Sequence, residues 1–155
     1  MEGDPDLSVE HDDDYTTVWA LADTGSAAHV ADHSKHFPGA ILDATQAGAR
    51  YTAANGTTFD NKGYFDVDRH TENHHKKHAR FAHGKVSMPI LSIRLWAQDG
   101  HRNIFDADSG ETIHLATGET DPIHGKLGAY FVKMILDPDI VEGADSPFVR
   151  PGIHG

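Results

Sequence analysis

Short runs of β-forming residues, interrupted by glycine, asparagine or aspartate, recur along this chain from Thr16 onward. Residues of the interrupting kind favour turns, so the pattern predicts many short strands and few helices. The predicted strands are Thr16 to Ala22, Arg50 to Ala53, Gly63 to Val67, Lys85 to Ile90, Arg102 to Phe105, Thr112 to Ala116 and Ala129 to Leu136. We therefore expect a mainly β fold whose sheet closes into a barrel, rather than a layered α/β fold.

Helical periodicity is scarce. The best candidate helix is Ser92 to Gln98, which begins at a serine that can cap it and ends before Gly100. A second candidate runs from Thr71 to Phe81, with Thr71 as the cap. The sequence thus predicts one or two short helices beside the strands.

The length of 155 residues suits one domain with a core of its own. Residues 1–14 contain seven acids and almost no large apolar side chain, which predicts a disordered acidic arm. We expect the folded domain to occupy residues 15–140 and a flexible tail to occupy residues 141–155. No internal repeat is visible in the sequence.

Composition argues against several classes of function. The chain has no cysteine, which rules out thiol catalysis and disulfide stapling. It has no run of about 18 apolar residues, so neither a membrane span nor a membrane partner is expected. Its net charge of −11 at pH 7 argues against a nucleic-acid partner, because a phosphate backbone requires a concentrated basic surface. Thirteen histidines predict that solubility and self-association depend on pH between about 5 and 7.

The first predicted strand ends in Asp23-Thr24-Gly25-Ser26. Two carboxylates held close together share one proton, so that one acts as an acid and the other as a base on a common water. The chain supplies one such acid, and a twofold homodimer would bring Asp23 of a second copy to it. Glycine at the third position would let the two backbones approach closely. The alternative interpretation of this tetrapeptide is an ordinary turn after a strand.

Two later segments stand in a fixed order after this tetrapeptide. Ala53-Ala54-Asn55-Gly56 contains the Asn-Gly pair that is typical of β-hairpin turns, and strand-like residues flank it. Such a hairpin can close over a bound peptide as a flap, or it can be a surface hairpin with no gating role. Further on, Ile90-Leu91-Ser92 places apolar residues directly before the predicted short helix.

In this order the chain resembles the retropepsins, and especially the protease segment of copia-type retrotransposon polyproteins. That family has an Asp-(Ser/Thr)-Gly loop with a downstream histidine, here His29, then a hairpin with Ala-Asn-Gly or Asp-Gly. A run of the form N-L-L-S-V-x-x-L follows, which resembles Ile90 to Leu95, and Gly100, Ile104-Phe105 and Gly110 continue the pattern. The resemblance covers roughly Val18 to Leu115.

The resemblance implies a retropepsin-like closed β-barrel with a flap hairpin, active as a homodimeric aspartic endopeptidase that cleaves peptide bonds, its own polyprotein among them. Asp23 would be catalytic, Thr24 the clasp between subunits, and Gly25 the residue of close approach. Ser26 would contact the dyad or the substrate backbone. The flap would be Ala53, Ala54, Asn55 and Gly56, and the wall of the active site Ile90, Leu91 and Ser92. No cofactor is implied, and the expected location is the cytoplasm or an assembling retroelement particle.

The segment from His70 to His83 is rich in histidines. Those that are four residues apart would lie on one face if the segment were helical. Imidazoles at that spacing can bind zinc, but interleaved lysines and arginine favour a solvated polar loop, and we predict no metal site. His29 is expected to be a buried, hydrogen-bonded side chain rather than a catalytic one. Asp106 to Glu111 is expected to be a turn between strands rather than a calcium loop.

Two alternatives from other functional classes remain. One is a catalytically inactive domain that keeps the same barrel and serves as a binding or scaffold segment. The other is a histidine-rich metal-binding protein, built on the cluster from His70 to His83. Cleavage specificity, processing sites and dimer affinity cannot be read from these patterns.

Overall fold

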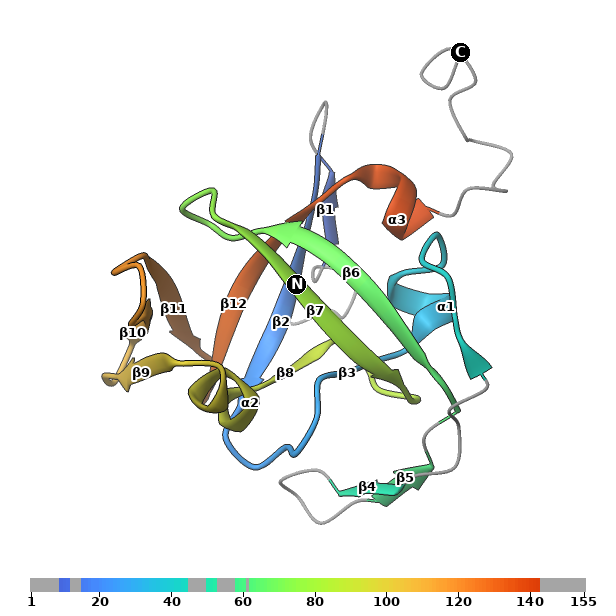
Figure 1. The fold of residues 1–155 in the computed structure, drawn as a ribbon, viewed down its shortest axis with the longest axis horizontal. Coiled ribbons are helices and arrows are strands. Elements are labelled where there is room, and N and C mark those ends of the chain that lie inside the picture. The colour runs from blue at the N-terminus through green and yellow to red at the C-terminus, as the bar shows by residue number, and fades with distance from the viewer. Residues whose placement is uncertain (1–8, 12–14, 45–49, 53–57, 61, 143–155) are drawn as a thin grey trace.

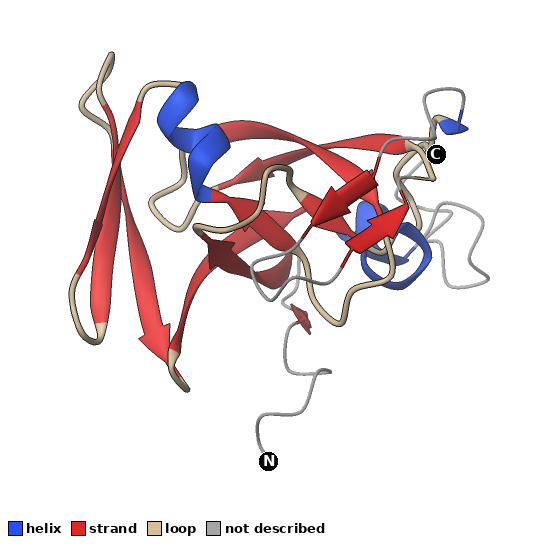
Figure 2. Cartoon of the chain, turned by 90° about the horizontal axis from the view of Figure 1, so that it is seen from below, coloured by secondary structure: helices blue, strands red, loops and turns tan. Residues whose placement is uncertain are grey.

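The computed structural model describes residues 9–11, 15–44, 50–52, 58–60 and 62–142. Strands make up most of this part of the chain, and the helices are short and lie at its margins (Figure 2). The prediction of a mainly β fold is therefore confirmed. None of the described helices is long and apolar enough to cross a membrane.

The elements follow one another along the chain as shown in Figure 1. The strands are β1 (Val9–His11), β2 (Thr16–Asp23), β3 (Val30–Ala31), β4 (Arg50–Thr52), β5 (Thr58–Asp60), β6 (Tyr64–His70), β7 (Lys76–His83), β8 (Ile90–Ser92), β9 (His101–Phe105), β10 (Ser109–His114), β11 (Thr120–Lys126) and β12 (Ala129–Leu136). The helices are α1 (His33–His36), α2 (Ile93–Gln98) and α3 (Pro138–Glu142).

Ten of the strands form one sheet in the order β1-β2-β8-β3-β7-β6-β12-β11-β10-β9. An additional pairing of β12 with β2 links two strands that are far apart in this order. The pairings from β2 through β8, β3, β7, β6 and β12 thus return to β2, so the arrangement is partly ring-like. Two of these strand pairings consist of a single residue pair, Val30 with Ile90 and His70 with Ile135.

Buried and half-buried residues alternate along the long strands β2 and β12, and this alternation determines which side chains point into the ring. In β2 the buried positions are Thr16, Val18, Ala20 and Ala22, and the residues between them are half-buried. Successive side chains of a strand point to opposite faces, so Trp19, Leu21 and Asp23 share the other face of β2. The same alternation buries every second residue of β12 from Val132 to Leu136.

The core inside the ring contains three phenylalanines in mutual contact. Phe81 of β7 stacks on Phe65 of β6 and on Phe37, with ring centroids 5.6 and 5.3 Å apart. Phe37 directly follows α1, so this short helix is held against the ring by the side chain at its end. Leu91 of β8 is fully buried in the same cluster. Packing of this kind anchors the strand that carries the candidate wall residues.

Strands β9, β10 and β11 extend the sheet outward from β12 by antiparallel hairpins. A glycine is required where β10 passes β9, because a Cβ at Gly110 would stand 2.2 Å from the carbonyl oxygen of Ile104. Asp106 forms the turn between β9 and β10 and donates its N–H to the carbonyl of Ser109 at 2.7 Å. The turn predicted from Asp106 to Glu111 is therefore only partly correct, because it covers residues 106–108 and β10 already begins at Ser109.

Several predictions agree with the structure in detail. The predicted strands beginning at Thr16 and at Ala129 correspond to β2 and β12. Helix α2 has Ser92 as its N-cap, and the left-handed φ of Gly100, +87°, follows its end. The strands around the Asn-Gly pair are also present, because β4 and β5 pair antiparallel with Thr52 opposite Thr58.

Other predictions are wrong. The segment from Thr71 to Phe81 is not a helix, because its second half is strand β7, held along its length by pairing with β6. The predicted strand from Lys85 to Ile90 is mostly loop, and pairing begins only at Ile90. Strand β1 falls within residues that were expected to be disordered, yet it pairs with β2. The domain boundaries otherwise stay predictions.

Candidate active site

The loop after β2 carries the candidate acid at the surface. Asp23 is the last residue of β2 and is half-buried, while Thr24 and Gly25 are exposed. The N–H of Gly25 donates to Oδ1 of Asp23 at 2.7 Å, which closes a tight turn. Within the described part of the chain, no second hydrogen bond to the carboxylate of Asp23 is present. The acid is therefore oriented by its own loop and accessible from outside.

Strand β8 lies between the two strands that flank this loop. It pairs parallel with β2, which sets Ser92 beside Asp23 and Ile90 beside Leu21. It also pairs antiparallel with β3, where Val30 is opposite Ile90. The predicted proximity of Ile90, Leu91 and Ser92 to the acid loop is therefore present, although the two segments are far apart in sequence (Figure 1).

Two serine hydroxyls hold the loop in this position. Ser26 is buried, and its Oγ donates to the carbonyl of Ala28 at 2.6 Å. Ser92 is fully buried, its Oγ donates to the carbonyl of Ser26 at 2.7 Å, and it accepts from the N–H of Leu95 at 3.1 Å. The hydroxyl of Ser26 therefore forms its hydrogen bond inside the loop and does not face a ligand. This differs from the role that the resemblance implied.

His29 forms the second connection between the loop and β8. Its Nδ1 accepts the N–H of Ser92 at 2.8 Å, so Nδ1 carries no proton and the ring is neutral with its hydrogen on Nε2. Burial, and to a smaller extent the positive charge of Arg69, lower the pKa of His29 to about 4. The prediction that His29 is a buried, hydrogen-bonded side chain is confirmed.

A small apolar cluster lies on the same face of β2 as Asp23. Ala28, Val30 and Ile90 are buried together, and Leu21 and Val86 pack against them. Leu21 stands two residues before Asp23, and side chains with this spacing point the same way. This cluster is separate from the core inside the ring. It forms an apolar wall beside the acid.

A hollow of about 300 Å³ adjoins the acid loop on its other side. Its lining residues are Leu21, Ala22, Asp23, Thr24, Phe105, Ala129 and Tyr130. Asp23 is the only acid among them. The rings of Phe105 and Tyr130 meet edge to face at 4.8 Å, which gives the hollow an aromatic side. Phe105 belongs to the outer strand β9 and Tyr130 to β12, and sequence patterns gave no signal that they would reach the acid loop.

The turn of the predicted flap, Ala53, Ala54, Asn55 and Gly56, lies outside the described residues. Its strands β4 and β5 form a separate two-stranded sheet. In Figure 1 this hairpin lies at the same end of the molecule as the loop between β2 and β3. The two strands of the predicted hairpin are therefore paired, and its gating role stays a prediction.

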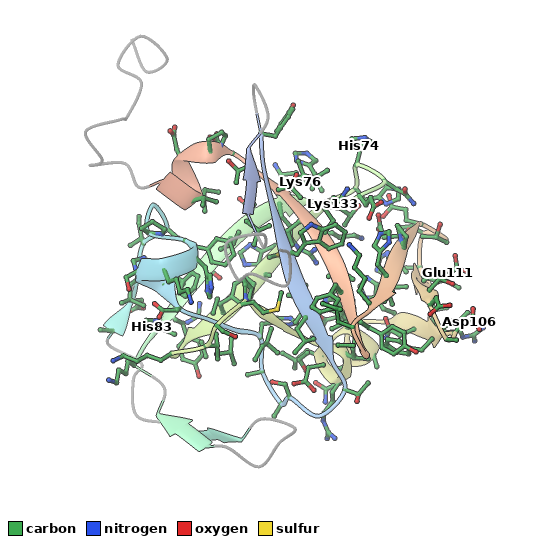
Figure 3. The ribbon with its side chains drawn as sticks, turned by 180° about the vertical axis from the view of Figure 1, so that it is seen from behind. His74, Lys76, His83, Asp106, Glu111 and Lys133 are labelled. Carbon is green, nitrogen blue, oxygen red and sulfur yellow. The ribbon has the colours of Figure 1, made fainter. Side chains whose placement is uncertain are left out.

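The histidine-rich segment does not gather its imidazoles at one point. Figure 3 shows His74 and His83 at opposite ends of β7. His78 lies between Asp66 and Asp68, 3.0 Å from an oxygen of each, and His75 is 3.1 Å from Asp121. Among the described residues no group of three or more histidines and acids is arranged to hold a metal ion. His78 instead pairs with carboxylates of the neighbouring strand β6, and His75 pairs with Asp121 of β11.

The buried charge of Arg69 was not predicted from the sequence. Arg69 lies on the inward face of β6 in line with Phe65 and Val67, and only 5% of it is exposed. Burial lowers the pKa of Arg69 to about 10, against the opposing effect of the Asp121 carboxylate. Its guanidinium stands 5.8 Å from the ring centroid of Trp96. Alternation along β6 would have predicted an apolar residue at this position.

A scan against protein-family models found no match, and searches of the curated proteins and of the solved structures found no significant match. The functional interpretation therefore depends on the geometry described above.

Proposed function

We propose that this chain is a retropepsin-like aspartic endopeptidase that works as a homodimer, with its ring of strands as the closed barrel of that family. One observation supports this most directly. The half-buried acid Asp23 is fixed beside Ser92 of β8, next to a small apolar cluster. An acid at such a position can act on a bound peptide. The order of the motifs in the sequence also supports an aspartic endopeptidase.

In the proposed reaction, Asp23 of each subunit shares one proton with the other across the twofold axis. The ionised carboxylate takes a proton from a water between them, and that water attacks the scissile carbonyl carbon. The protonated carboxyl donates its proton to the carbonyl oxygen, which gives a tetrahedral intermediate with no covalent bond to the enzyme. As the C–N bond breaks, the newly protonated carboxyl donates its proton to the leaving nitrogen, and one hydroxyl of the intermediate returns a proton to the other carboxylate. The products are a carboxylic acid and an amine, and the dyad again holds one proton.

The substrate would lie extended across the loop and bond through its backbone as an added strand. Leu21, Phe105 and Tyr130, which line the hollow beside Asp23, would then face side chains of the peptide, which favours apolar residues next to the scissile bond. The hairpin of β4 and β5 would cover the peptide as a flap. Exposed Thr24 and Gly25 are available to meet the second subunit.

Cleavage of a peptide library by purified protein tests this function. Asp23→Asn keeps a carbonyl oxygen that can accept the N–H of Gly25, so the variant should fold and dimerise but cleave nothing. Asp106→Asn is the matched control, because the Asp106 side chain is exposed in the turn between β9 and β10 and does not line the hollow beside Asp23 (Figure 3). Retained cleavage by Asp23→Asn would rule out the proposal.

The pH profile gives a second test. A dyad that shares one proton works best in mild acid, so the rate should fall as pH rises above neutrality. A rate that stays flat up to about pH 9 contradicts the proposal. If the protein instead bound peptides without cleaving them, and a pepstatin-type inhibitor failed to displace those peptides, that result would indicate an inactive binding domain.

A further inference from the structure

We propose that the cavity around Arg69 is a binding site for a small oxyanion of the size of inorganic phosphate. Residues of β6, β7, β9, β10, β11, β12 and helix α2 line this cavity. It shares no lining residue with the hollow beside Asp23, so it is separate from the candidate active site. The proposal therefore does not depend on the proposed peptidase function.

The guanidinium of Arg69 is buried without an acceptor. Only 5% of Arg69 is exposed, and its Nε–H has no hydrogen-bond partner. Within the described ranges no hydrogen bond or ion pair joins the guanidinium to another residue, and its nearest recorded contact is the ring of Trp96 at 5.8 Å. A buried cation without an acceptor is costly to the fold. A ligand that supplies acceptor oxygens would remove this cost.

The buried acid beside the cavity is engaged by other donors. Oδ1 of Asp121 accepts the backbone N–H of Asn73 at 3.0 Å, and Oδ2 lies 3.1 Å from Nδ1 of His75. Glu72, which also lines the cavity, is paired with His124 at 2.8 Å. Asp121 therefore acts on the guanidinium through its charge but accepts no hydrogen bond from it.

Two further groups of the lining are also available to an anion. Thr112 is buried, and its hydroxyl oxygen has no hydrogen-bond partner. His29 carries its hydrogen on Nε2, because its Nδ1 accepts the N–H of Ser92. No described residue accepts that hydrogen. Donors without acceptors thus line one cavity, and buried polar groups of this kind normally have partners. An oxyanion can accept from all of them.

The size of the cavity limits the ligand. Its volume is about 70 Å³. One water molecule needs about 10–15 Å³ on the same measure, so several non-hydrogen atoms fit but a nucleotide does not. The planar fork of a guanidinium matches two oxygens of a phosphate or sulfate. Exposed His78 and Asp99 also belong to the lining, which leaves a side that is open to solvent.

Titration of the full chain with inorganic phosphate tests this site, with sodium chloride added to keep the ionic strength constant. We expect the melting temperature of the wild type to rise with phosphate concentration. Arg69→Met keeps a long side chain and removes the buried charge, so without phosphate it should be at least as stable as the wild type. Its phosphate dissociation constant should be higher by about tenfold or more. For Thr112→Val an increase of about threefold is expected.

Arg102→Met is the matched control. Arg102 is exposed on β9 and does not line the cavity, so this variant should keep the full response to phosphate. An equal response in the wild type and Arg69→Met would overturn the proposal, as would a wild type that responds no more to phosphate than to chloride. Either result would indicate a cavity filled with water.

NMR of the wild type provides a measurement that needs no variant. The Nε–H resonance of Arg69 should shift in both dimensions of a ¹H–¹⁵N spectrum as phosphate is added, because its nitrogen gains an acceptor. A resonance that stays in place at saturating phosphate would contradict the site even if Arg69→Met did not fold. Peptide cleavage by the wild type is measured separately, so the failure of this site would leave the proposed function standing.

Discussion

The N–H of Ser92 donates to Nδ1 of His29 at 2.8 Å, and this bond joins the strand after the acid loop to the start of helix α2. Both groups are buried, so neither can turn to water when the bond is lost. The side chain of Ser92 bonds to the loop as well, through the carbonyl of Ser26. The position of Asp23 therefore depends on residues that do not touch a substrate.

His29→Phe should loosen the acid loop. The variant keeps an aromatic ring but removes the acceptor, which leaves the buried N–H of Ser92 unsatisfied at a cost of about 1–3 kcal/mol. We expect the free energy of unfolding in urea to fall by that amount. His70→Phe is the control, because His70 is exposed at the end of β6 and should change stability little. Equal stabilities of the two variants would contradict the structural role of His29.

Ser92→Ala should cost more than a surface serine does. It removes the N-cap of α2, worth about 1 kcal/mol, and the bond to the carbonyl of Ser26, worth a similar amount. We expect a loss of about 2 kcal/mol in thermal or urea unfolding, together with reduced peptidase activity. Ser87→Ala provides the comparison, since Ser87 is exposed and its side chain caps no helix. Ser92→Ala with wild-type stability would show that the cap is dispensable.

Stability should fall in mild acid because of His29. Its pKa in the folded protein is about 4, below the usual 6.5, since burial and then the charge of Arg69 disfavour the protonated ring. The unfolded chain therefore takes up a proton first, and the contribution of His29 is complete above pH 6.5 and decreases as pH falls toward 4. The loss reaches about 3 kcal/mol. Urea unfolding of wild type and His29→Phe between pH 4 and 7 measures it, and parallel curves would contradict it.

His78 should act in the opposite direction. A hydrogen bond to Asp68 raises its pKa, burial opposes this, and Asp66 raises it further. The protonated ring is therefore favoured in the folded state, and its stabilising effect is lost as pH rises through its folded pKa. His78→Asn should flatten this part of the stability profile at neutral pH. Titration of the imidazole by NMR checks the direction, and a pKa below 6.5 would show it to be wrong.

Gly110→Ala should disrupt the outer strands that carry Phe105. The new Cβ would meet the carbonyl oxygen of Ile104 at 2.2 Å, so β9 and β10 must separate, at a cost of about 1–3 kcal/mol. Gly118→Ala isolates the backbone effect, because Gly118 has a φ of +79° but open space around it, and should cost about 1 kcal/mol. Unfolding in urea compares the two. A smaller loss for Gly110→Ala than for Gly118→Ala would contradict the close approach.

Local features of this protein were predictable from its sequence. Strands β2 and β12 follow from runs of β-branched and aromatic residues, and helix α2 follows from a capping serine and a terminating glycine. The position of Asp23 at the end of a strand follows in the same way. Each of these features depends on residues within one turn or strand of each other, so neighbouring side chains are sufficient to determine them.

Pairing between distant segments was decided by the tertiary structure alone. The segment from Lys76 to Phe81 is rich in helix-forming residues but is a strand, because β6 supplies its hydrogen bonds and Phe81 fills the core. The bond from Ser92 to His29 crosses 63 residues, and the hollow beside Asp23 is completed by Phe105 and Tyr130 from later strands. Alternation shows which face of a strand is buried, but the neighbour and the register of that strand are set only when the whole core packs.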